Sequence, residues 1–531
     1  MIPEVALAPR DLGPAPAAAR RLCKELERRL GEGSASTSSG ELSAVSRDAW
    51  PKAMLWQRQG LAPKPPDVVV WPRSLEQVAE LLAFAREQGI PVTPYGAGSG
   101  VCGGAIPLRG GIVLDLKRLD KIRRIDKDEL VVEAEAGVPG LPLEQRVGAE
   151  GLTIGHFPSS IMVSTVGGWV AARGAGQCSA RYGKIEDMVQ GLTAVLGSGA
   201  IVRPSRPTAG QDLLELLAGS EGTLGVITDV TLRLWRAPEL QVPRGYRFPT
   251  LEAALGAMRG AFRAGLRPSV LRLYDPFDTM IAMRGHDARE AAAPPPPRHP
   301  APGGLRHAAA AAASRRLEAL KRAALDVALS RPRGLNLAAA ALDACLLVVV
   351  HEGPRGRVEL EAERMKELCL AAGARDLGEG PGRHWLQKRY DVSFKMPTMF
   401  AADGWVDTCE VATSWGKVAQ LYDDVREAVS PHAFVMAHFS HAYADGCSIY
   451  FSLAGAAGDV KRGLESYDRA WNAALDAADR AGATLTHHHG VGLLKAPWLS
   501  RELGAGGREL LAAAKRACDP AGILNPGKLG L

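Results

Sequence analysis

Two glycine-rich stretches decide the fold of this chain. The first is Pro94-Tyr95-Gly96-Ala97-Gly98-Ser99-Gly100-Val101-Cys102-Gly103-Gly104, and the second is Ser164-Thr165-Val166-Gly167-Gly168-Trp169-Val170-Ala171-Ala172-Arg173-Gly174-Ala175-Gly176. Glycine has no side chain and readily adopts positive φ, so the backbone N–H groups of such runs can close on a diphosphate or a flat ring system. A β-like segment precedes each run, at residues 89–93 and 152–154. The chain is therefore predicted to wrap an extended dinucleotide.

Two further segments strengthen this interpretation. They are Gly219-Ser220-Glu221-Gly222-Thr223-Leu224-Gly225-Val226-Ile227-Thr228 and Asp519-Pro520-Ala521-Gly522-Ile523-Leu524-Asn525-Pro526-Gly527-Lys528. In this order and spacing, the four segments resemble the flavoprotein superfamily of vanillyl-alcohol oxidase and p-cresol methylhydroxylase, from about Pro65 to Leu531. The resemblance implies an α+β fold with a two-subdomain FAD-binding domain of the p-cresol methylhydroxylase (PCMH) type and an inserted α/β cap domain for the substrate.

Composition excludes several other classes of protein. The chain has 531 residues, of which 46% are hydrophobic and 23% charged, as is ordinary for a soluble protein of more than one domain. The longest apolar candidate, Ala338–Val350, contains Asp343 and is too short to span a bilayer. A net charge of +6, interleaved with acids, does not favour nucleic-acid binding. The N-terminal residues lack the order of a secretory signal and the eight cysteines form no C-x-x-C pair, so we expect a cytoplasmic protein without disulfides or a metal site.

The chain is predicted to have four parts. Residues 1–60 form a leader with a helix at 18–30 and a flexible Ser/Gly-rich segment at 31–40. Residues 61–237 form the FAD-binding domain. Its predicted elements are strands at 67–72, 111–116 and 130–136 and a helix at 74–88 capped by Ser74. Residues 238–484 form the cap, with strands at 269–274 and 345–350 and helices at 358–372 and 415–429, and residues 485–531 return to the FAD domain. A Pro/Ala-rich insertion at 286–316 is predicted to be disordered. Its basic second half could form a helix, for which a solvated surface position is favoured over contact with lipid.

The family resemblance also implies which residues bind the cofactor. Pro94–Gly104 would take the diphosphate, Pro158–Thr165 would run beside the isoalloxazine, Gly167–Arg173 would contact the ribityl chain and diphosphate, and Gly219–Gly225 would reach the adenine end. The candidate cofactor-binding residues are Pro94, Tyr95, Gly96, Ala97, Gly98, Ser99, Gly100, Gly103, Gly104, Pro158, Ser159, Ser164, Thr165, Gly167, Gly168, Trp169, Ala172, Arg173, Gly219, Glu221, Gly222, Thr223, Gly225, Val226 and Ile227. Val101-Cys102 stands where some relatives carry a flavin-linking histidine, so we expect non-covalent FAD.

Three segments resemble one branch of this superfamily, the alkyldihydroxyacetonephosphate synthases. They are Ser164–Trp169 together with Arg181–Asp187, then His441–Phe451, and finally His487-His488-His489-Gly490-Val491-Gly492. The resemblance implies that Tyr443 removes a proton, that His487, His488 and His489 relay protons or hold phosphate, and that Arg272 supports activity. Lys395 falls where the synthases carry an Arg-Asp pair for the substrate phosphate, and lysine lacks the bidentate fork of arginine.

Other interpretations of these residues stay open. A tyrosine with a reference pKa of about 10 needs help to act as a base, and a lone Tyr443 is more often a packing residue. A run of histidines is often a solvated turn or a metal site. Metal binding is the less favoured interpretation here, because three adjacent histidines on an extended segment cannot all point one way.

The leading functional hypothesis is an FAD-dependent enzyme that exchanges the acyl chain of acyl-dihydroxyacetone phosphate for a long-chain alcohol, in the synthesis of ether lipids. The alternative is an FAD-dependent D-2-hydroxy-acid dehydrogenase or alcohol oxidase, although His489-Gly490-Val491-Gly492 lacks the Asp and Asn of its usual C-terminal segment. A non-catalytic flavin-binding or lipid-binding module is the third. We also expect a homodimer with peripheral membrane contact.

Overall fold

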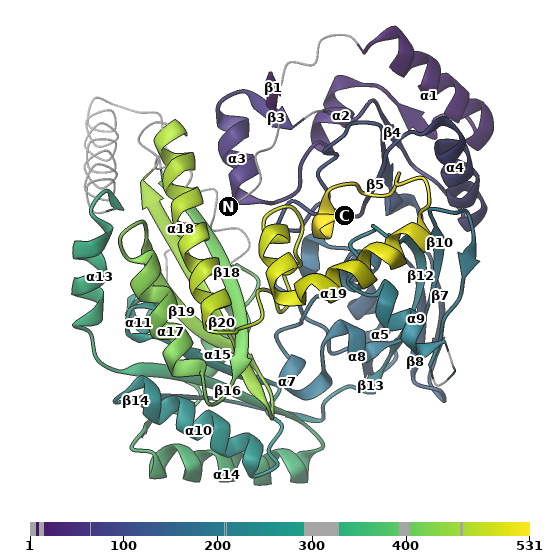
Figure 1. Ribbon diagram of the computed structural model, residues 1–531. Helices are drawn as coiled ribbons and strands as arrows, with labels where there is room; N and C mark the ends of the chain where they lie inside the picture. The colour runs from purple at the N-terminus through teal and green to yellow at the C-terminus, as the bar shows by residue number, and fades with distance from the viewer. Residues whose placement is uncertain are drawn as a thin grey trace, which may run out of the picture.

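The computed structural model describes residues 7–9, 15–63, 65–206, 208, 210–290, 329–391, 404–456 and 460–531 (Figure 1). Two parts lie side by side, an N-terminal domain drawn in purple and blue and a cap domain drawn in teal and green. Nearly all of the predicted insertion at 286–316 lies outside the described residues, as does Lys395.

The N-terminal domain contains two sheets. The first has the strand order β2 (Ala35–Ser36), β4 (Val68–Val70), β6 (Ile112–Asp115), β5 (Val92–Tyr95), and the second has the order β11 (Ile201–Val202), β10 (Val189–Leu196), β12 (Gly225–Arg233), β8 (Val131–Glu135), β7 (Ile122–Asp126). Two small sheets pair β1 (Leu7–Pro9) with β3 (Leu61–Pro63) and β9 (Leu152–Thr153) with β13 (Trp235–Arg236). The helices are α1 (Ala17–Leu30), α2 (Ser39–Ala44), α3 (Pro51–Arg58), α4 (Leu75–Gln88), α5 (Gly140–Gly148), α6 (Val166–Ala171), α7 (Ser179–Tyr182), α8 (Ile185–Met188) and α9 (Gln211–Leu217).

Local sequence signals account for several of these elements. Helix α4 begins after Ser74, whose hydroxyl accepts the backbone N–H of Gln77 at 3.3 Å, and ends at Gly89 in the left-handed conformation. Its apolar spacing buries Val78, Leu81 and Leu82 against the first sheet. The predicted helix at 74–88 and the strands at 67–72, 111–116 and 130–136 are thereby confirmed.

The segment expected to be a flexible leader is instead folded onto the domain. Ala35 and Ser36 pair antiparallel with strand β4, because this sheet otherwise presents an open edge there. Further on, the Trp50 indole N–H donates to the hydroxyl of Tyr467 in the cap at 2.9 Å, and Lys52 pairs with Asp468 at 2.7 Å. Residues 31–40, which were predicted to be flexible, contain the short strand β2 and the start of helix α2.

The cap domain is built on one seven-stranded antiparallel sheet. Its strand order is β17 (Arg375–Asp376), β14 (Leu240–Phe248), β16 (Cys345–Gly353), β15 (Val270–Tyr274), β19 (Phe434–Ala442), β20 (Gly446–Ala456), β18 (Gly404–Ser414). The helices are α10 (Leu251–Arg263), α11 (Pro276–Glu290), α13 (Pro332–Ala340), α14 (Arg355–Ala371), α15 (Gly380–Lys388), α17 (Val418–Val429) and α18 (Val460–Arg480). The strands and helices predicted for this domain are confirmed.

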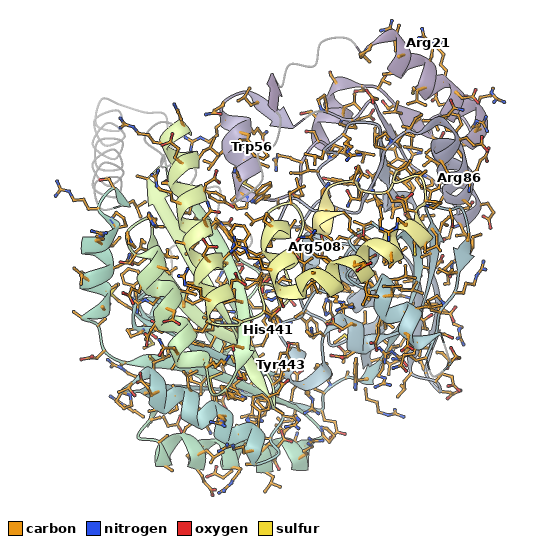
Figure 2. The ribbon with its side chains drawn as sticks, in the orientation of Figure 1. Arg21, Trp56, Arg86, His441, Tyr443 and Arg508 are labelled. Atoms are coloured by element: carbon orange, nitrogen blue, oxygen red, sulfur yellow. The ribbon has the colours of Figure 1, made fainter. Side chains whose placement is uncertain are left out.

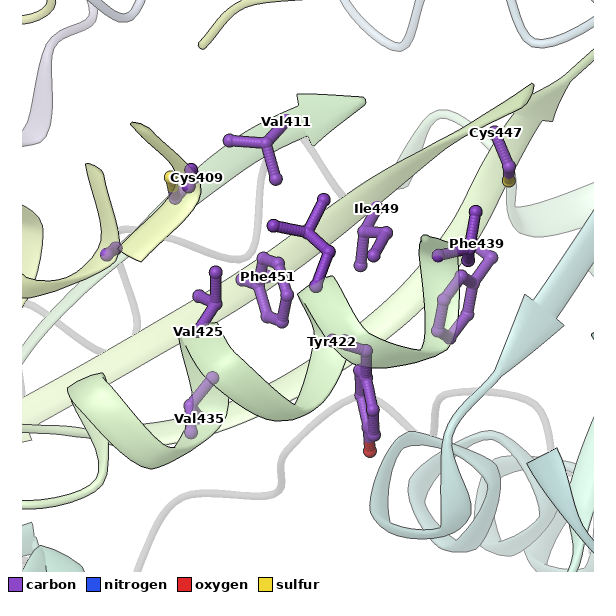
Figure 3. Packing of buried hydrophobic residues seen from close by; sticks show 14 of the residues in the cluster. Cys409, Val411, Tyr422, Val425, Val435, Phe439, Cys447, Ile449 and Phe451 are labelled. Carbon is purple, nitrogen blue, oxygen red and sulfur yellow. The ribbon is translucent and has the colours of Figure 1, made fainter. Parts of the chain in front are cut away.

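Alternation along the strands gives the sheet two different faces. Leu271, Leu273, Ile449 and Phe451 point into the core beneath helices α10, α14, α17 and α18. Figure 3 shows Ile449 and Phe451 within this core. The intervening residues, such as Arg272 and Tyr450, therefore point to the opposite face, which meets the N-terminal domain. One face of the sheet therefore packs in the core, and the other face is available to form one wall of a site.

The last part of the chain crosses back to the N-terminal domain (Figure 1). Helix α19 (Ala496–Cys518) runs over that domain, and Leu524 forms a parallel bridge with Val92. The Asn525 amide donates to the carbonyl of Gly104 at 2.9 Å and to that of Glu221 at 2.7 Å. Two glycine loops are thus tied to the C-terminal segment. Within the described ranges, no helix combines the length and the apolar character needed to cross a bilayer.

Candidate active site

A cavity of about 740 Å³ lies between the cap sheet and the N-terminal domain. The glycine loops after β5 and around α6 form one wall, and strands β15, β19 and β20 form the other. His441, labelled in Figure 2, lies near the junction of the two domains. The site therefore exists only where the two domains meet.

The glycine-rich wall is suited to an anionic, flat ligand. The backbone N–H groups of Ala97, Gly98, Ser99 and Gly100 line the cavity and donate to no protein acceptor among the described residues. At Gly168, an added Cβ would meet only the Thr165 hydroxyl, at 3.2 Å, so the space beside it belongs to the cavity. Free amide donors next to side-chain-free positions fit the diphosphate and rings of FAD.

Most of the predicted cofactor-binding residues do line this cavity. Those that line it are Pro94, Tyr95, Gly96, Ala97, Gly98, Ser99, Gly100, Gly104, Pro158, Ser159, Ser164, Thr165, Gly167, Gly168, Trp169, Ala172, Glu221, Gly222, Gly225, Val226 and Ile227. Those that do not are Gly103, Arg173, Gly219 and Thr223.

These four residues support the wall from behind. Gly103 has φ +78, and a Cβ there would meet the Trp50 ring at 2.8 Å. Arg173 donates to the carbonyls of Ala218 and Glu215, and Thr223 donates to that of Ser220. Gly219 is packed against the Arg173 side chain.

Gly168→Val should abolish FAD binding while leaving the fold intact. The new methyl groups would occupy cavity space that the cofactor needs. They would not disturb the fold, because a Cβ at this position meets no protein atom other than the Thr165 hydroxyl. Flavin content per chain after purification measures the effect, and the thermal midpoint reports the fold. Gly256→Val is the matched control, because Gly256 lies in helix α10 with open space around it. Wild-type flavin content in Gly168→Val would show that the cofactor does not approach this backbone.

Arg272 presents a guanidinium to the cavity. Its Nη2 lies 2.9 Å from Nε2 of His438, and its buried Nε has no partner within the described part of the chain. A guanidinium can only donate, so His438 accepts at Nε2 and carries its proton on Nδ1, 3.3 Å from Oδ2 of Asp278. Burial, and then the charge of Arg272, hold the pKa of His438 well below its usual range. The arrangement therefore leaves the positively charged guanidinium of Arg272 beside the neutral imidazole of His438.

The triple histidine lies next to the same wall. His488 and His489 line the cavity, with ring centroids 6.0 and 5.2 Å from that of Tyr450, whereas His487 lies behind them. Burial lowers the pKa of His487 and of His489 to about 4 and that of His488 further, so all three are neutral at pH 7. Among the described residues, no group of three or more His, Cys, Asp or Glu side chains is arranged to hold a metal ion.

Tyr443 and Tyr450 occupy different places in the β19–β20 hairpin. Tyr443 does not line the cavity, and its hydroxyl donates to Ser179 at 3.1 Å (Figure 2). Tyr450 lines it, stacked on His438 with ring centroids 4.6 Å apart. Burial raises the pKa of Tyr450 to about 12 and that of Tyr443 higher. Of these two tyrosines, Tyr450 is the one that lines the cavity.

His441 was not singled out from the sequence. It lines the cavity with φ +55, at a register shift between Ser440 and Ala442, and its Nδ1 lies 2.8 Å from the hydroxyl of Ser179. A bulge of this kind re-aims a side chain and is not readable from periodicity. Tyr450 and His438 could have been found, because each follows the same alternation as Arg272 on its own strand.

The remaining wall combines apolar and basic side chains. Ile281, Met283, Leu346, Val348 and Met436 supply apolar lining. Helix α15 adds His384 and Lys388, and Arg389 follows at its C-terminal end.

Comparison with known proteins gives two family matches. Residues 66–205 match the FAD binding domain and residues 237–529 match the C-terminal domain of FAD linked oxidases. The chain is 30% identical over 490 residues to alkyldihydroxyacetonephosphate synthase of Trypanosoma brucei brucei, covering 90% of this chain and 75% of that protein. It is 26% identical to glycolate oxidase subunit GlcD of Bacillus subtilis (strain 168), covering 87% and 89%.

Solved structures share the fold. A structure of alkyldihydroxyacetonephosphate synthase is similar with a TM-score of 0.73 at 23% identity, covering 96% of this chain and 84% of that one. A structure of p-cresol methylhydroxylase with substrate bound is similar with a TM-score of 0.70 at 16% identity, covering 99% of each chain.

Proposed function

This chain belongs to the FAD-linked oxidase family with FAD as its cofactor, and we propose that it exchanges the acyl chain of acyl-dihydroxyacetone phosphate for a long-chain alcohol. The carbon that bears the acyl ester loses its bond to the ester oxygen and gains a bond to the alcohol oxygen. The fatty carboxylate leaves, and the alcohol proton passes to a base. The exchange involves no net oxidation.

The observation that carries this proposal is that polar and apolar side chains line one cavity together. The polar ones include Arg272, His438, Tyr450, His488 and His489. The apolar ones come from α11, β16 and β19. A phosphate head with a long aliphatic chain needs both kinds of lining, whereas a small hydroxy acid would leave the apolar side chains uncovered. The 30% identity to a synthase supports the same choice.

The cavity residues have separable tasks in this exchange. When bound, FAD supplies a ring system that can accept an electron pair from the substrate and return it. The Arg272 fork would hold the phosphate through charge-assisted hydrogen bonds. The phenol of Tyr450 is protonated at neutral pH, and the neutral imidazoles of His488 and His489 can take protons, so the site holds an acid beside two bases.

FAD should be released by acid precipitation of the protein. Cys102 is 3% exposed and burial holds its thiol pKa well above the usual range, so a reactive thiolate is disfavoured where relatives carry a linking residue. Absorbance of the supernatant after precipitation measures the released flavin. A yellow pellet would show a covalent bond.

Peripheral contact with a lipid surface is part of this proposal. Val163 and Ile281 line the cavity and are 46% and 45% exposed, and Met162, which precedes Val163, is 50% exposed. Exposed apolar side chains at a cavity opening suit a substrate that leaves a bilayer. We also propose a homodimer with a cytoplasmic location, and sedimentation with and without vesicles tests assembly and lipid contact.

The decisive experiment omits every electron acceptor. Acyl-dihydroxyacetone phosphate, hexadecanol and holoenzyme should yield the alkyl product and free fatty acid, with the flavin spectrum oxidised before and after. A spectrum bleached by a 2-hydroxy acid, with no alkyl product, would overturn the proposal and favour the dehydrogenase.

A further inference from the structure

Glu410 lies beneath the triple histidine and takes no part in the site as described so far. Its carboxylate accepts the backbone N–H groups of His487 at 2.5 Å, His489 at 2.9 Å and His488 at 3.4 Å. The hydroxyl of Thr486 donates to the same carboxylate at 2.9 Å. One side chain therefore binds four consecutive residues of the segment that carries the imidazoles.

Glu410 is also half of a buried ion pair. Its Oε1 lies 2.9 Å from Nζ of Lys495, and both side chains are 0% exposed. Burial alone would raise the pKa of Glu410, but Lys495 and the neighbouring histidines lower it to about 2. The carboxylate is therefore ionised at neutral pH.

Strand pairing places this carboxylate beside Tyr450. Glu410 on β18 and Tyr450 on β20 are directly opposite each other in the antiparallel register, so their side chains leave the same face of the sheet. The histidine segment belongs to the C-terminal part of the chain and Tyr450 belongs to the cap. Glu410 ties one to the other, next to the backbone bridge between Ala412 on the same strand and Thr484.

We propose that Glu410 is a positioning residue, whose buried carboxylate holds His488 and His489 against Tyr450 and supplies the negative charge that His487 and His489 face. Backbone amides gathered on one carboxylate fix where the segment runs, and hence where both imidazoles point. This inference rests on the proposed function where the alkyl-exchange rate is measured, whereas the NMR measurement described below does not depend on it.

The charge of Glu410 acts to raise the pKa of two of the three histidines, His487 and His489. Burial lowers the pKa of His487 and of His489, and Glu410 opposes that lowering. Several titratable or charged groups from other elements face the histidines. They are Glu410 on β18, His441 on β19, Tyr443 in the β19–β20 turn, Tyr450 on β20, Lys495 before α19 and Lys184 before α8. Removing the negative charge alone leaves Lys495 unopposed, so the pKa values of His487 and His489 should fall further in Glu410→Gln.

The experiment compares Glu410→Gln, Lys495→Met and the double variant as holoenzymes. Glu410→Gln should lose thermal stability, because Lys495 is left as an uncompensated buried charge. The double variant removes both charges and should recover most of that stability. Its alkyl-exchange rate should nevertheless stay lowered by about 10–100-fold, the order expected when acid–base groups are misplaced by an ångström.

Histidine titration by NMR supplies a readout that needs no substrate. In the double variant, the imidazole signals of residues 487–489 should move relative to wild type. Glu502→Gln is the matched control, since Glu502 also accepts a backbone N–H from this segment, that of Leu485 at 3.0 Å, and is exposed. It should change neither rate nor imidazole signals.

Recovery of both exchange rate and imidazole signals in the double variant would overturn the proposal, because Glu410 would then only neutralise Lys495. If wild type shows no alkyl exchange, the proposed function fails, and the NMR comparison still decides the role of Glu410.

Discussion

Tyr450→Phe should slow alkyl exchange by about 10²–10⁴-fold, the usual contribution of a positioned acid–base group. The substitution removes one hydroxyl from a ring that is stacked on His438 and adjacent to His489, and the packing of the ring stays as it was. FAD content and the thermal midpoint should therefore remain those of wild type. Turnover of acyl-dihydroxyacetone phosphate measures the loss.

Tyr443→Phe is the matched control for this experiment. It removes a hydroxyl from the same hairpin, one that donates to Ser179 outside the cavity wall. Its exchange rate should stay within a few-fold of wild type, since a neutral side-chain hydrogen bond contributes about 1 kcal/mol. If Tyr443→Phe is the slow variant and Tyr450→Phe is not, the sequence-based choice of Tyr443 was right.

Arg272→Lys should lower kcat/KM for the phosphorylated substrate by about 10²–10³-fold, because a charge-assisted bidentate contact is replaced by a single point charge. Lysine also loses the hydrogen bond to His438 and the position over the Tyr274 ring, whose centroid lies 5.2 Å from the guanidinium carbon. Steady-state kinetics with acyl-dihydroxyacetone phosphate measure the loss.

A substrate without phosphate separates recognition from general damage. With acyl-dihydroxyacetone, wild type and Arg272→Lys should react at similarly low rates, since neither has a phosphate to hold. Arg267→Lys is the control, because Arg267 sits over the Phe262 ring and does not line the cavity. Equal losses with both substrates would show that Arg272 maintains the wall and does not read phosphate.

Much of this architecture could be predicted from the sequence because it depends on local signals. Glycine runs after short strands identify the dinucleotide wall, and Ser74 identifies the start of its helix. Arg272 stands between two leucines on a strand, and alternation alone sends it to the face opposite the core.

The remaining site residues depend on contacts that are distant in sequence. Choosing between Tyr443 and Tyr450 requires knowing that the β19–β20 turn carries Tyr443 past the cavity wall while Tyr450 returns along the strand. His441 reaches the cavity through a bulge, and Glu410 meets the histidines across a sequence separation of 77 residues. No pattern within a short window contains those relations, which tertiary packing alone creates.

Synthesis of the chain proceeds from the N-terminus, so the bridge between Val92 and Leu524 has a consequence for how the holoenzyme is made. The glycine loop that follows Val92 leaves the ribosome early, but its partners Asn525 and Lys528, which contact Gly104 and Ile106, are translated 421 and 422 residues after them. Domains usually fold in order as they emerge. Here the N-terminal domain must wait in an unfinished state while the whole cap is made, and flavin should be taken up only after translation has passed residue 528. Ribosome-bound chains stalled before residue 519 should consequently retain no flavin, whereas released full-length chains should load it.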